Sequence, residues 1–365
     1  MLESVSALRG IGAEVLVVCP MPGELTIRIG ERNARVLHLR FPVIRRAYWS
    51  PGGMVRLCAQ LVCDLPQMIR LIRRERPNII YVNTTAIPWW ILAARMTRTP
   101  VVCHVHEAES HDNRRVLWAL NAPLLFATRL ILISKTSAEA TFNIFPRLSR
   151  TSAIVMNGVP DRENPPVSPP DGVPTRLSVV SRLSPRKGVH TAIAAVAILR
   201  QHGHDVQLEI AGSTFSGYEW YEAQLRSQVA ELGLEEFVSF SGYVSPSTMV
   251  FDRSDIVIAP SEREPFGNAV VEAQLAERPV VAAAAGGHLE SITDGWNGLL
   301  VGVERPAEFA DAVLRLLADR TLRETIAVHA RQSALERFGL TRYRKEIVDV
   351  LSRALPESKR AASGG

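Results

Sequence analysis

Apolar runs alternate with helical patterns along most of this 365-residue chain. Several runs are continuously apolar and β-branched, as strands buried on both faces of a parallel sheet require. They predict strands at 14–19, 36–39, 79–82, 101–105, 130–133, 153–156, 177–180, 206–210, 238–240, 256–259, 280–283 and 298–301. Helical periodicity lies between many of them, for example at 189–201, 218–232 and 307–319. The alternation indicates parallel βαβ units and occurs twice, so we expect an α/β protein with two doubly wound, Rossmann-like domains.

The expected domain boundary is marked by composition. Residues 161–175 contain five prolines and no apolar periodicity, which is typical of a semi-rigid linker. The linker separates a domain at 1–160 from a second at 176–340, and residues 341–365 should form a helix and a tail. Ligands of open α/β sheets bind beyond the carboxyl ends of the strands. Two such domains facing each other would therefore form a binding cleft.

The first domain departs from this plan at its start. The chain opens with a helical pattern at 2–9 and only then reaches a strand, whereas a doubly wound domain begins with a strand and a glycine-containing turn. In the usual order the absent strand would be central, and its loss would leave two unpaired edges. We therefore expect the true start to lie upstream; the alternative is a chain that has lost the element.

The charge is distributed unevenly along the chain. Residues 1–160 hold 20 Lys and Arg against 10 Asp and Glu, and the remainder holds 22 against 27. This asymmetry indicates that one domain meets an anionic surface. The four cysteines lack metal-binding spacing, no signal peptide is visible, and no run approaches the ~20 apolar residues of a membrane span. We expect a cytoplasmic protein with reduced thiols.

A basic and aromatic stretch suits the surface of an anionic membrane. Residues 45–49 read Arg-Arg-Ala-Tyr-Trp, and the helix predicted at 55–75 follows them. That helix carries Arg56, Arg70, Arg73 and Arg74, and Trp89 and Trp90 lie nearby in sequence. Such composition favours peripheral membrane contact. The alternative is a solvated helix face, with Pro66 expected to break the helix. No nucleic-acid-binding motif accompanies these residues, so nucleic acid is not an expected partner.

Two cations follow the strand predicted at 177–180. Arg182 and Lys187 lie in the turn, and Gly188 then opens the next helix. A Lys near a helix start complements the helix dipole poorly, so its presence there indicates an anion to be bound. An Arg fork and a Lys point charge together suit a diphosphate. The alternative is a solvated surface pair.

Two carboxylates flank the next polar turn. Glu264 and Glu272 stand on either side of Pro265-Phe266-Gly267, after the strand predicted at 256–259. The helix predicted at 268–276 would turn its first amides, near Asn268 and Ala269, towards a phosphate. Alternatively, Glu264 only favours a helix N-terminus electrostatically. Two carboxylates beside two cations could hold a polyhydroxyl group next to a diphosphate, which is the recognition problem of a nucleotide-sugar.

A pair of histidines ends the strand predicted at 101–105. His104 and His106 share a face and could chelate a metal with Glu107 and His111. We expect no metal here, because a mid-sheet His-x-His pair is also common as core packing, and favour His106 as a hydrogen-bond donor to a ligand. The chain has no Asp-x-Asp pair, which weighs against a Mg²⁺-bridged diphosphate. The glycines at 286–287 and in Asn157-Gly158 are explained by turn chemistry.

The order of these motifs resembles a known family. Arg182-Leu183-x3-Lys187-Gly188 is followed by Gly242-Tyr243-Val244, Glu264-x7-Glu272-Ala273, Gly286-Gly287 and Gly298-Leu299-Leu300-Val301. This collection resembles the GT-B glycosyltransferases, specifically glycosyltransferase family 4, also called glycosyl transferases group 1. The resemblance is close over residues 153–340 and looser over the first half.

The resemblance implies a retaining, metal-independent hexosyltransferase without a cofactor. It would move a hexose from a UDP- or GDP-linked sugar to a glycan or lipid-linked acceptor in cell-envelope or extracellular polysaccharide or glycolipid synthesis. Arg182 and Lys187 would hold the diphosphate, Glu264 the sugar hydroxyls, Glu272 the ribose, and His106 the sugar near its anomeric carbon. The remaining implied donor-binding residues are Tyr243 and Val244, near the base, with Phe266, Gly267, Asn268 and Ala269.

Two other functions remain open. The chain could be a non-catalytic GT-B scaffold or partner subunit, or another GT-B enzyme such as a nucleotide-sugar epimerase. The presence of Arg182, Lys187, Glu264 and Glu272 weighs against the first. The Arg-Leu-x3-Lys-Gly spacing weighs against the second. As a transferase the protein would lie on the inner face of the cell membrane.

Overall fold

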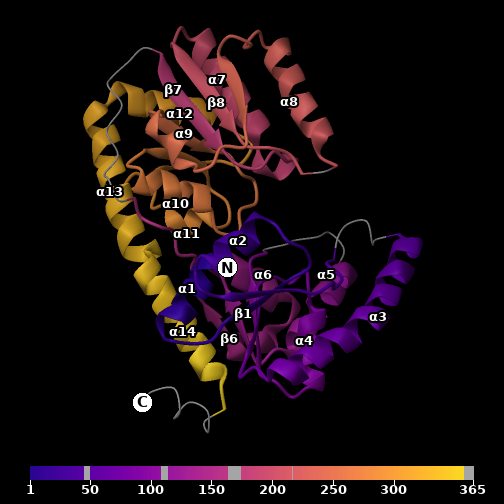
Figure 1. The fold of residues 1–365 in the computed structure, drawn as a ribbon. Helices are drawn as coiled ribbons and strands as arrows, with labels where there is room; N and C mark the ends of the chain where they lie inside the picture. The colour runs from indigo at the N-terminus through magenta and orange to yellow at the C-terminus, as the bar shows by residue number, and fades with distance from the viewer. Residues whose placement is uncertain (45–49, 108–113, 163–173, 216, 357–365) are drawn as a thin grey trace. The chain divides into compact units, whose positions relative to one another are not determined.

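The computed structural model describes residues 1–44, 50–107, 114–162, 174–215 and 217–356. The chain divides into two compact units, both α/β and both built on parallel strands (Figure 1). Unit 1 consists of Met1–Gly158 with Leu340–Gly365, and unit 2 of Val159–Gly339. Most of the predicted linker, residues 163–173, lies outside the described residues, and the first strand of unit 2 begins at Thr175.

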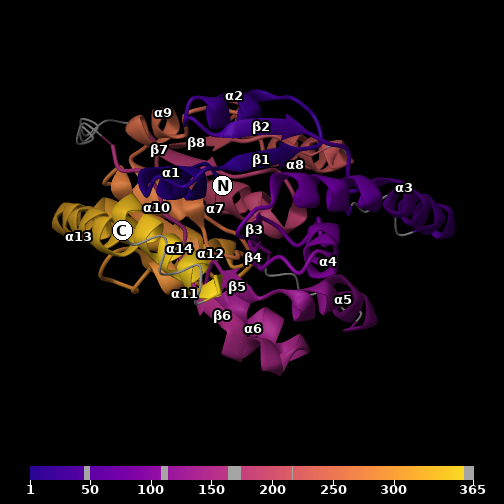
Figure 2. The same cartoon turned by 60° about the horizontal axis from the view of Figure 1, so that its bottom comes forward.

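The described strands of unit 1 fall into two parallel sheets (Figure 2). One pairs β1 (Leu16–Cys19) with β2 (Arg35–His38). The other has the order β3-β4-β5-β6 and contains β3 (Ile80–Val82), β4 (Val101–Val105), β5 (Arg129–Leu132) and β6 (Ser152–Ile154). Among the described residues no backbone ladder joins the two sheets.

The helices of unit 1 come from both ends of the chain. They are α1 (Leu2–Gly10), α2 (Glu24–Gly30), α3 (Pro51–Glu75), α4 (Trp89–Met96), α5 (Arg114–Asn121), α6 (Lys135–Ile144), α14 (Leu340–Ala354) and the 3₁₀ turns η2 (Ala122–Phe126) and η3 (Pro146–Thr151). Tyr343 and Ile347 of α14 are buried in one cluster with Val102 and Ile131 of the sheet. A Cβ on Gly158 would lie 2.6 Å from the Cβ of Tyr343, so this glycine admits α14. Turn chemistry alone does not explain Gly158.

Helix α3 corrects one expectation and helix α4 another. Helix α3 runs unbroken through Pro66, because Leu57, Met68, Leu71 and Ile72 on its inner side are buried. Burying each such side chain contributes ~1.5–3 kcal/mol, enough to offset the ~3 kcal/mol cost of an internal proline. Trp90 is buried edge-to-face against Phe41, so it does not belong to an exposed aromatic surface. Residues 45–49 lie outside the described residues.

Unit 2 is built on one continuous parallel sheet. Its strands are β7 (Thr175–Val180), β8 (Val206–Ala211), β9 (Val238–Gly242), β10 (Ile256–Ala259), β11 (Val280–Ala283) and β12 (Leu299–Val301). The order is β12-β11-β10-β7-β8-β9, so β7 is central and lies beside β10 and β8. Every strand predicted from the pattern, in both units, is confirmed to within two residues at each end.

The helices of unit 2 enclose this sheet. They are η4 (Pro185–Lys187), α7 (Val189–Gln201), α8 (Glu219–Glu231), α9 (Thr248–Asp252), α10 (Asn268–Leu275), α11 (His288–Ser291), α12 (Pro306–Ala318) and α13 (Arg320–Phe338). The largest core cluster joins Ile193 and Val196 of α7 to Phe309 and Val313 of α12 and to Ile210 of β8. Across the described residues of both units, no helix is long and apolar enough to span a membrane.

Candidate functional site

The loop from β7 to α7 is fixed by a glycine against the end of β10. Gly188 has φ 66°, a left-handed conformation, and a Cβ there would lie 2.1 Å from the carbonyl oxygen of Pro260. Both observations favour glycine over any L side chain. Because β7 and β10 are neighbours in the sheet, the loops that follow them meet at one edge. The β7–α7 loop carries Arg182 and Lys187, and the β10–α10 loop carries Glu264.

Lys187 and Glu264 form a nearly buried ion pair at this edge. The Lys187 Nζ donates to Glu264 Oε2 at 2.5 Å, and the side chains are 15% and 12% exposed. Burial alone would raise the pKa of Glu264, but the charge and hydrogen bond of Lys187, with smaller effects from His288 and Arg186, hold that pKa below its usual value. The carboxylate therefore stays ionised at neutral pH. The sequence placed these residues on separate turns, and the structure brings them together.

A glycine pair holds the backbone of Glu264. The Gly287 N–H donates to the Glu264 carbonyl at 2.7 Å, and a Cβ on Gly286 would lie 2.2 Å from the same oxygen. His288, which opens α11, is buried, and its ring comes within 3.1 Å of where a Gly267 Cβ would be. Sequence reasoning missed these roles. The signal was the paired glycines, but a close approach between distant segments cannot be read from local turn chemistry.

The residues after Glu264 divide between core and surface. Phe266 is 2% exposed and packs edge-to-face on Phe338 with ring centroids 5.4 Å apart, so only its backbone could contact a ligand. Gly267, at φ 97°, precedes the first residue of α10. Asn268 is exposed and Ala269 half-buried in the first turn of α10. The first amides of a helix suit an anion.

Glu272 lies on α10 and is held by a serine from another loop. Ser247 Oγ donates to Glu272 Oε2 at 2.7 Å. Burial raises the pKa of Glu272, and the hydrogen bond from Ser247 only partly opposes this. The same β9–α9 loop carries Tyr243, which is 78% exposed, and the half-buried Val244. Ser247 is a second residue that the sequence did not identify.

Arg182 is held by an aromatic ring. Its guanidinium carbon lies 4.0 Å from the ring centroid of Phe215, a cation–π contact. No carboxylate among the described residues forms an ion pair with Arg182. Its charge therefore remains available to an anion at the carboxyl edge of the sheet.

His106 belongs to unit 1, immediately after β4. Its Nε2 is 3.2 Å from Asn83 Oδ1, and its ring lies over that of His104 with centroids 4.1 Å apart. Burial lowers the pKa of His106 to about 4, so the ring is neutral at physiological pH. His104 is fully buried and hydrogen-bonded through Nδ1 to the Tyr81 hydroxyl, while its Nε2 has no hydrogen-bond partner among the described residues.

The metal-chelating alternative for these histidines is not favoured by their geometry. The rings of His104 and His106 lie one over the other, and the Oε1 of Glu107 accepts a hydrogen bond from Thr84 at 2.6 Å. His111, the other ligand considered, lies outside the described residues.

The described residues of unit 2 thus gather two cations, two carboxylates and a helix N-terminus at one sheet edge. The cations and amides can neutralise negative charge, and the carboxylates can accept hydrogen bonds from hydroxyl groups. Such a site suits a ligand that is anionic at one end and polyhydroxylated at the other.

Comparisons with known proteins identify the family of the chain. The family model described as "Glycosyl transferases group 1" matches residues 161–333, and that described as "Glycosyl transferase 4-like domain" matches residues 1–156. An uncharacterized glycosyltransferase of Methanocaldococcus jannaschii is 28% identical over 71% of this chain and 70% of its own length. The 2-deoxystreptamine glucosyltransferase of Streptomyces kanamyceticus is 26% identical over 85% and 86%. The D-inositol 3-phosphate glycosyltransferase of Corynebacterium urealyticum is 34% identical, but over only 51% of this chain and 45% of its own.

Solved structures share the architecture of the whole chain. Anabaena HepE, in complex with UDP and glucose, is 25% identical with a TM-score of 0.79, covering 96% of this chain and 94% of its own. A glycosyltransferase from Rickettsia africae, 18% identical, has a TM-score of 0.80 and covers 98% and 94%, which supports the fold alone. Taken with the two family matches, which together span nearly the whole chain, these likenesses show that the protein belongs to the group 1 glycosyltransferases of the GT-B fold.

Proposed function

We propose that the protein transfers a hexose from UDP-hexose, with retention of anomeric configuration and without a catalytic metal. The nearly buried Lys187–Glu264 pair carries this proposal, since a cation and a carboxylate lie side by side there, as binding of a diphosphate and a sugar requires. HepE, which is similar over almost the whole chain, was crystallised with UDP and with UDP and glucose. That likeness favours a uridine donor over the guanosine alternative.

In the proposed donor complex, Arg182 and Lys187 bind the diphosphate together with the first amides of α10. Glu264 accepts hydrogen bonds from the sugar hydroxyls, and Glu272 from the ribose. Tyr243 and Val244 would lie near the base. Negative charge develops on the β-phosphate as the glycosidic bond breaks, and cations already in place stabilise it without reorganisation, as donors in an oxyanion hole do. His106, a neutral imidazole, would hydrogen-bond the sugar.

Nucleotide binding is the first test. We expect UDP to raise the thermal midpoint of the wild-type chain, because a ligand at ~100 times its Kd stabilises the folded state by about 2.7 kcal/mol. Arg182→Ala should lose most of the shift. Arg226→Ala, on the exposed face of α8, is the matched control and should keep it. GDP, ADP and dTDP serve as competitors for the choice of base.

The outcomes separate the alternatives. A UDP shift lost only in Arg182→Ala, with release of UDP from UDP-glucose when acceptor is present, supports the transferase. Equal shifts in both variants would contradict the assignment of Arg182. Absence of a shift with every nucleotide would favour a non-catalytic GT-B scaffold.

The acceptor is proposed to be a glycan or lipid-linked molecule of the cell envelope, met at a membrane surface. Arg56, Arg70 and Arg73 of α3 are exposed, as are the apolar side chains of Val55 and Val62 on the same helix. Cationic and apolar groups on one helix favour attachment to anionic lipid. Trp90 takes no part in this surface because it is buried.

A further inference from the structure

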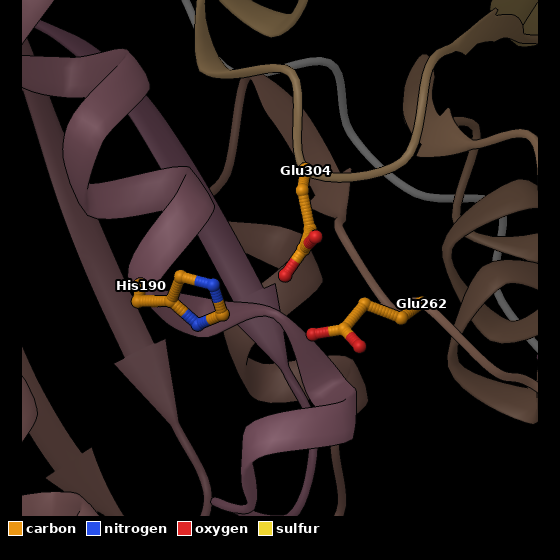
Figure 3. A group of neighbouring side chains, drawn as sticks. All are labelled: His190, Glu262 and Glu304. Carbon is orange, nitrogen blue, oxygen red and sulfur yellow. The ribbon is translucent and has the colours of Figure 1, made fainter.

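Three metal-ligating side chains meet at the carboxyl edge of the unit 2 sheet, outside the proposed donor residues. His190 is the second residue of α7, Glu262 lies in the loop after β10, and Glu304 lies in the loop after β12. One ligand atom from each lies within 4.8 Å of the other two. Figure 3 shows both carboxylates turned towards the imidazole. Residues far apart in the sequence thus converge on one point.

The charge of this cluster is not balanced by a side-chain cation. In the described part of the chain, neither Glu262 nor Glu304 has a Lys or Arg partner within 4.0 Å, and His190 makes no ion pair with either. Two carboxylates this close repel each other unless a cation lies between them. His190 and Glu262 are half-buried, which strengthens that repulsion, and Glu304 is exposed and free to adjust.

The imidazole of His190 is already oriented by a residue outside the cluster. Its Nδ1 is 3.0 Å from the hydroxyl of Tyr221, which is 2% exposed. This contact fixes the ring and leaves Nε2 directed towards the carboxylates (Figure 3). Histidines that ligate metals commonly donate their other ring N–H to a hydrogen-bond acceptor, a role that the tyrosine oxygen can fill.

We propose that His190, Glu262 and Glu304 bind a zinc ion, with water in the fourth position. An imidazole with two carboxylates is a ligand set that zinc accepts, and three protein ligands plus water is a common zinc coordination. Ligand atoms on one tetrahedral zinc lie about 3.3 Å apart. The ligand atoms lie within 4.8 Å of one another here, so the three side chains would draw together on the ion.

The ion would connect the two loops that carry the donor residues. Lys187 lies three residues before His190, and Glu264 lies two residues after Glu262. Glu262 and Glu264 have separate partners, so the ion and the Lys187–Glu264 pair would join the same two loops independently. The zinc is therefore structural, and the proposed transfer chemistry remains free of metal.

Zinc titration of the EDTA-treated full chain tests this site. Calorimetry should give one zinc per chain, and the thermal midpoint should rise with zinc. His190→Ala and Glu304→Gln should each weaken binding at least tenfold. Tyr221→Phe, which removes the orienting hydroxyl, should weaken it by roughly 10–100-fold. Glu304 is exposed, so its variant tests the site without risk to folding.

Matched controls separate this site from other zinc-binding groups. His329→Ala, whose ring stacks on Trp296, and His106→Ala in unit 1 should bind zinc like the wild type. No zinc uptake by the wild type, unchanged uptake by Glu304→Gln, or loss of uptake in His106→Ala would each overturn the proposal. The rise in thermal midpoint with UDP is measured on the EDTA-treated chain. Its absence would therefore show failure of the donor site independently of zinc binding.

Discussion

The two units follow one plan but differ at its centre. In unit 2 the first strand, β7, lies between β10 and β8, and the loop after it delivers Arg182 and Lys187. In unit 1 the described strands form two sheets without a ladder between them, and His106, the one proposed catalytic group there, follows β4 instead. The comparison teaches that in unit 2 the two cations are delivered by the loop after a central strand, at a glycine turn. Among the described residues of unit 1, the strand β4 is followed instead by the neutral ring of His106.

The largest expected effect is a loss of turnover on substitution of a cation in unit 2. Lys187→Ala removes a cation from the proposed diphosphate site, and loss of one such donor typically costs ~10²–10³ in rate. Steady-state turnover of UDP-hexose measures it.

Lys187→Ala also leaves Glu264 nearly buried without its partner, so stability needs its own control. In Lys187→Ala/Glu264→Gln the unpaired charge is gone, and a normal melting curve with low turnover would locate the defect in the chemistry. Wild-type turnover in either variant would contradict the proposed role of Lys187 and the difference drawn between the two units.

The next effect is a loss of affinity for anionic membranes on substitution of exposed arginines of α3 in unit 1. Arg56→Ser/Arg70→Ser/Arg73→Ser removes three exposed charges from α3, each worth about 1 kcal/mol at an anionic surface. Affinity for phosphatidylserine vesicles in a sedimentation assay should therefore fall ~100-fold. Arg226→Ser/Arg320→Ser in unit 2 is the control, and an equal loss there would mean that the units do not differ in this respect.

A smaller effect concerns stability: replacing different glycines that have left-handed backbone conformations should cost different amounts of unfolding free energy. Gly188→Ala meets the Pro260 carbonyl at 2.1 Å, whereas a Cβ on Gly203 (φ 83°) or on Gly12 of unit 1 (φ 77°) meets nothing within 4 Å. All three should lose about 1 kcal/mol from the backbone conformation alone, and Gly188→Ala should lose ~2 kcal/mol more. Denaturant melts measure this, and equal losses would show that the β7–α7 loop can relax.

The smallest effect on activity concerns pH and unit 1. The pKa of His106 is lowered from its ordinary 6.5 to about 4, so His106 should not titrate in the activity profile between about pH 6 and 8. As pH falls from 6.5 towards 4 the unfolded chain takes up a proton that the folded chain refuses, so stability should fall with pH across that window. NMR titration of the ring proton, with His106→Gln to assign it, gives the value. A midpoint near 6.5 would contradict the burial argument.

Within unit 2, the pKa values of Glu264 and Glu272 are shifted in opposite directions. The lowered pKa of Glu264 contributes stability above its ordinary value of 4.5, and that contribution is lost as pH falls through the lowered value. The pKa of Glu272 is raised, so protonation on acidification relieves a cost of burial. Glu264 is held in its charged form by Lys187, whereas Glu272 is shielded from water and has Ser247 as its hydrogen-bond partner.

The strands were predictable because burial on both faces leaves a continuous apolar run. The motif residues Arg182, Lys187, Glu264 and Glu272 were also visible as polar positions after such runs. Their pairing was not, because it depends on β10 lying beside β7, a fact of sheet order. Where packing overrides local rules the pattern failed, as at Pro66 inside α3.

Unit 1 is not a continuous stretch of chain, and this affects how the protein is made. Its core includes Tyr343, Ile347 and Leu351 of α14, for which Gly158 leaves room. Domains generally fold as units, beginning with the N-terminal one during synthesis. Here unit 1 begins to emerge from the ribosome first but is complete only after α14 has been synthesised. All residues of unit 2 are synthesised before α14. The second half of the sequence can thus finish folding before the first.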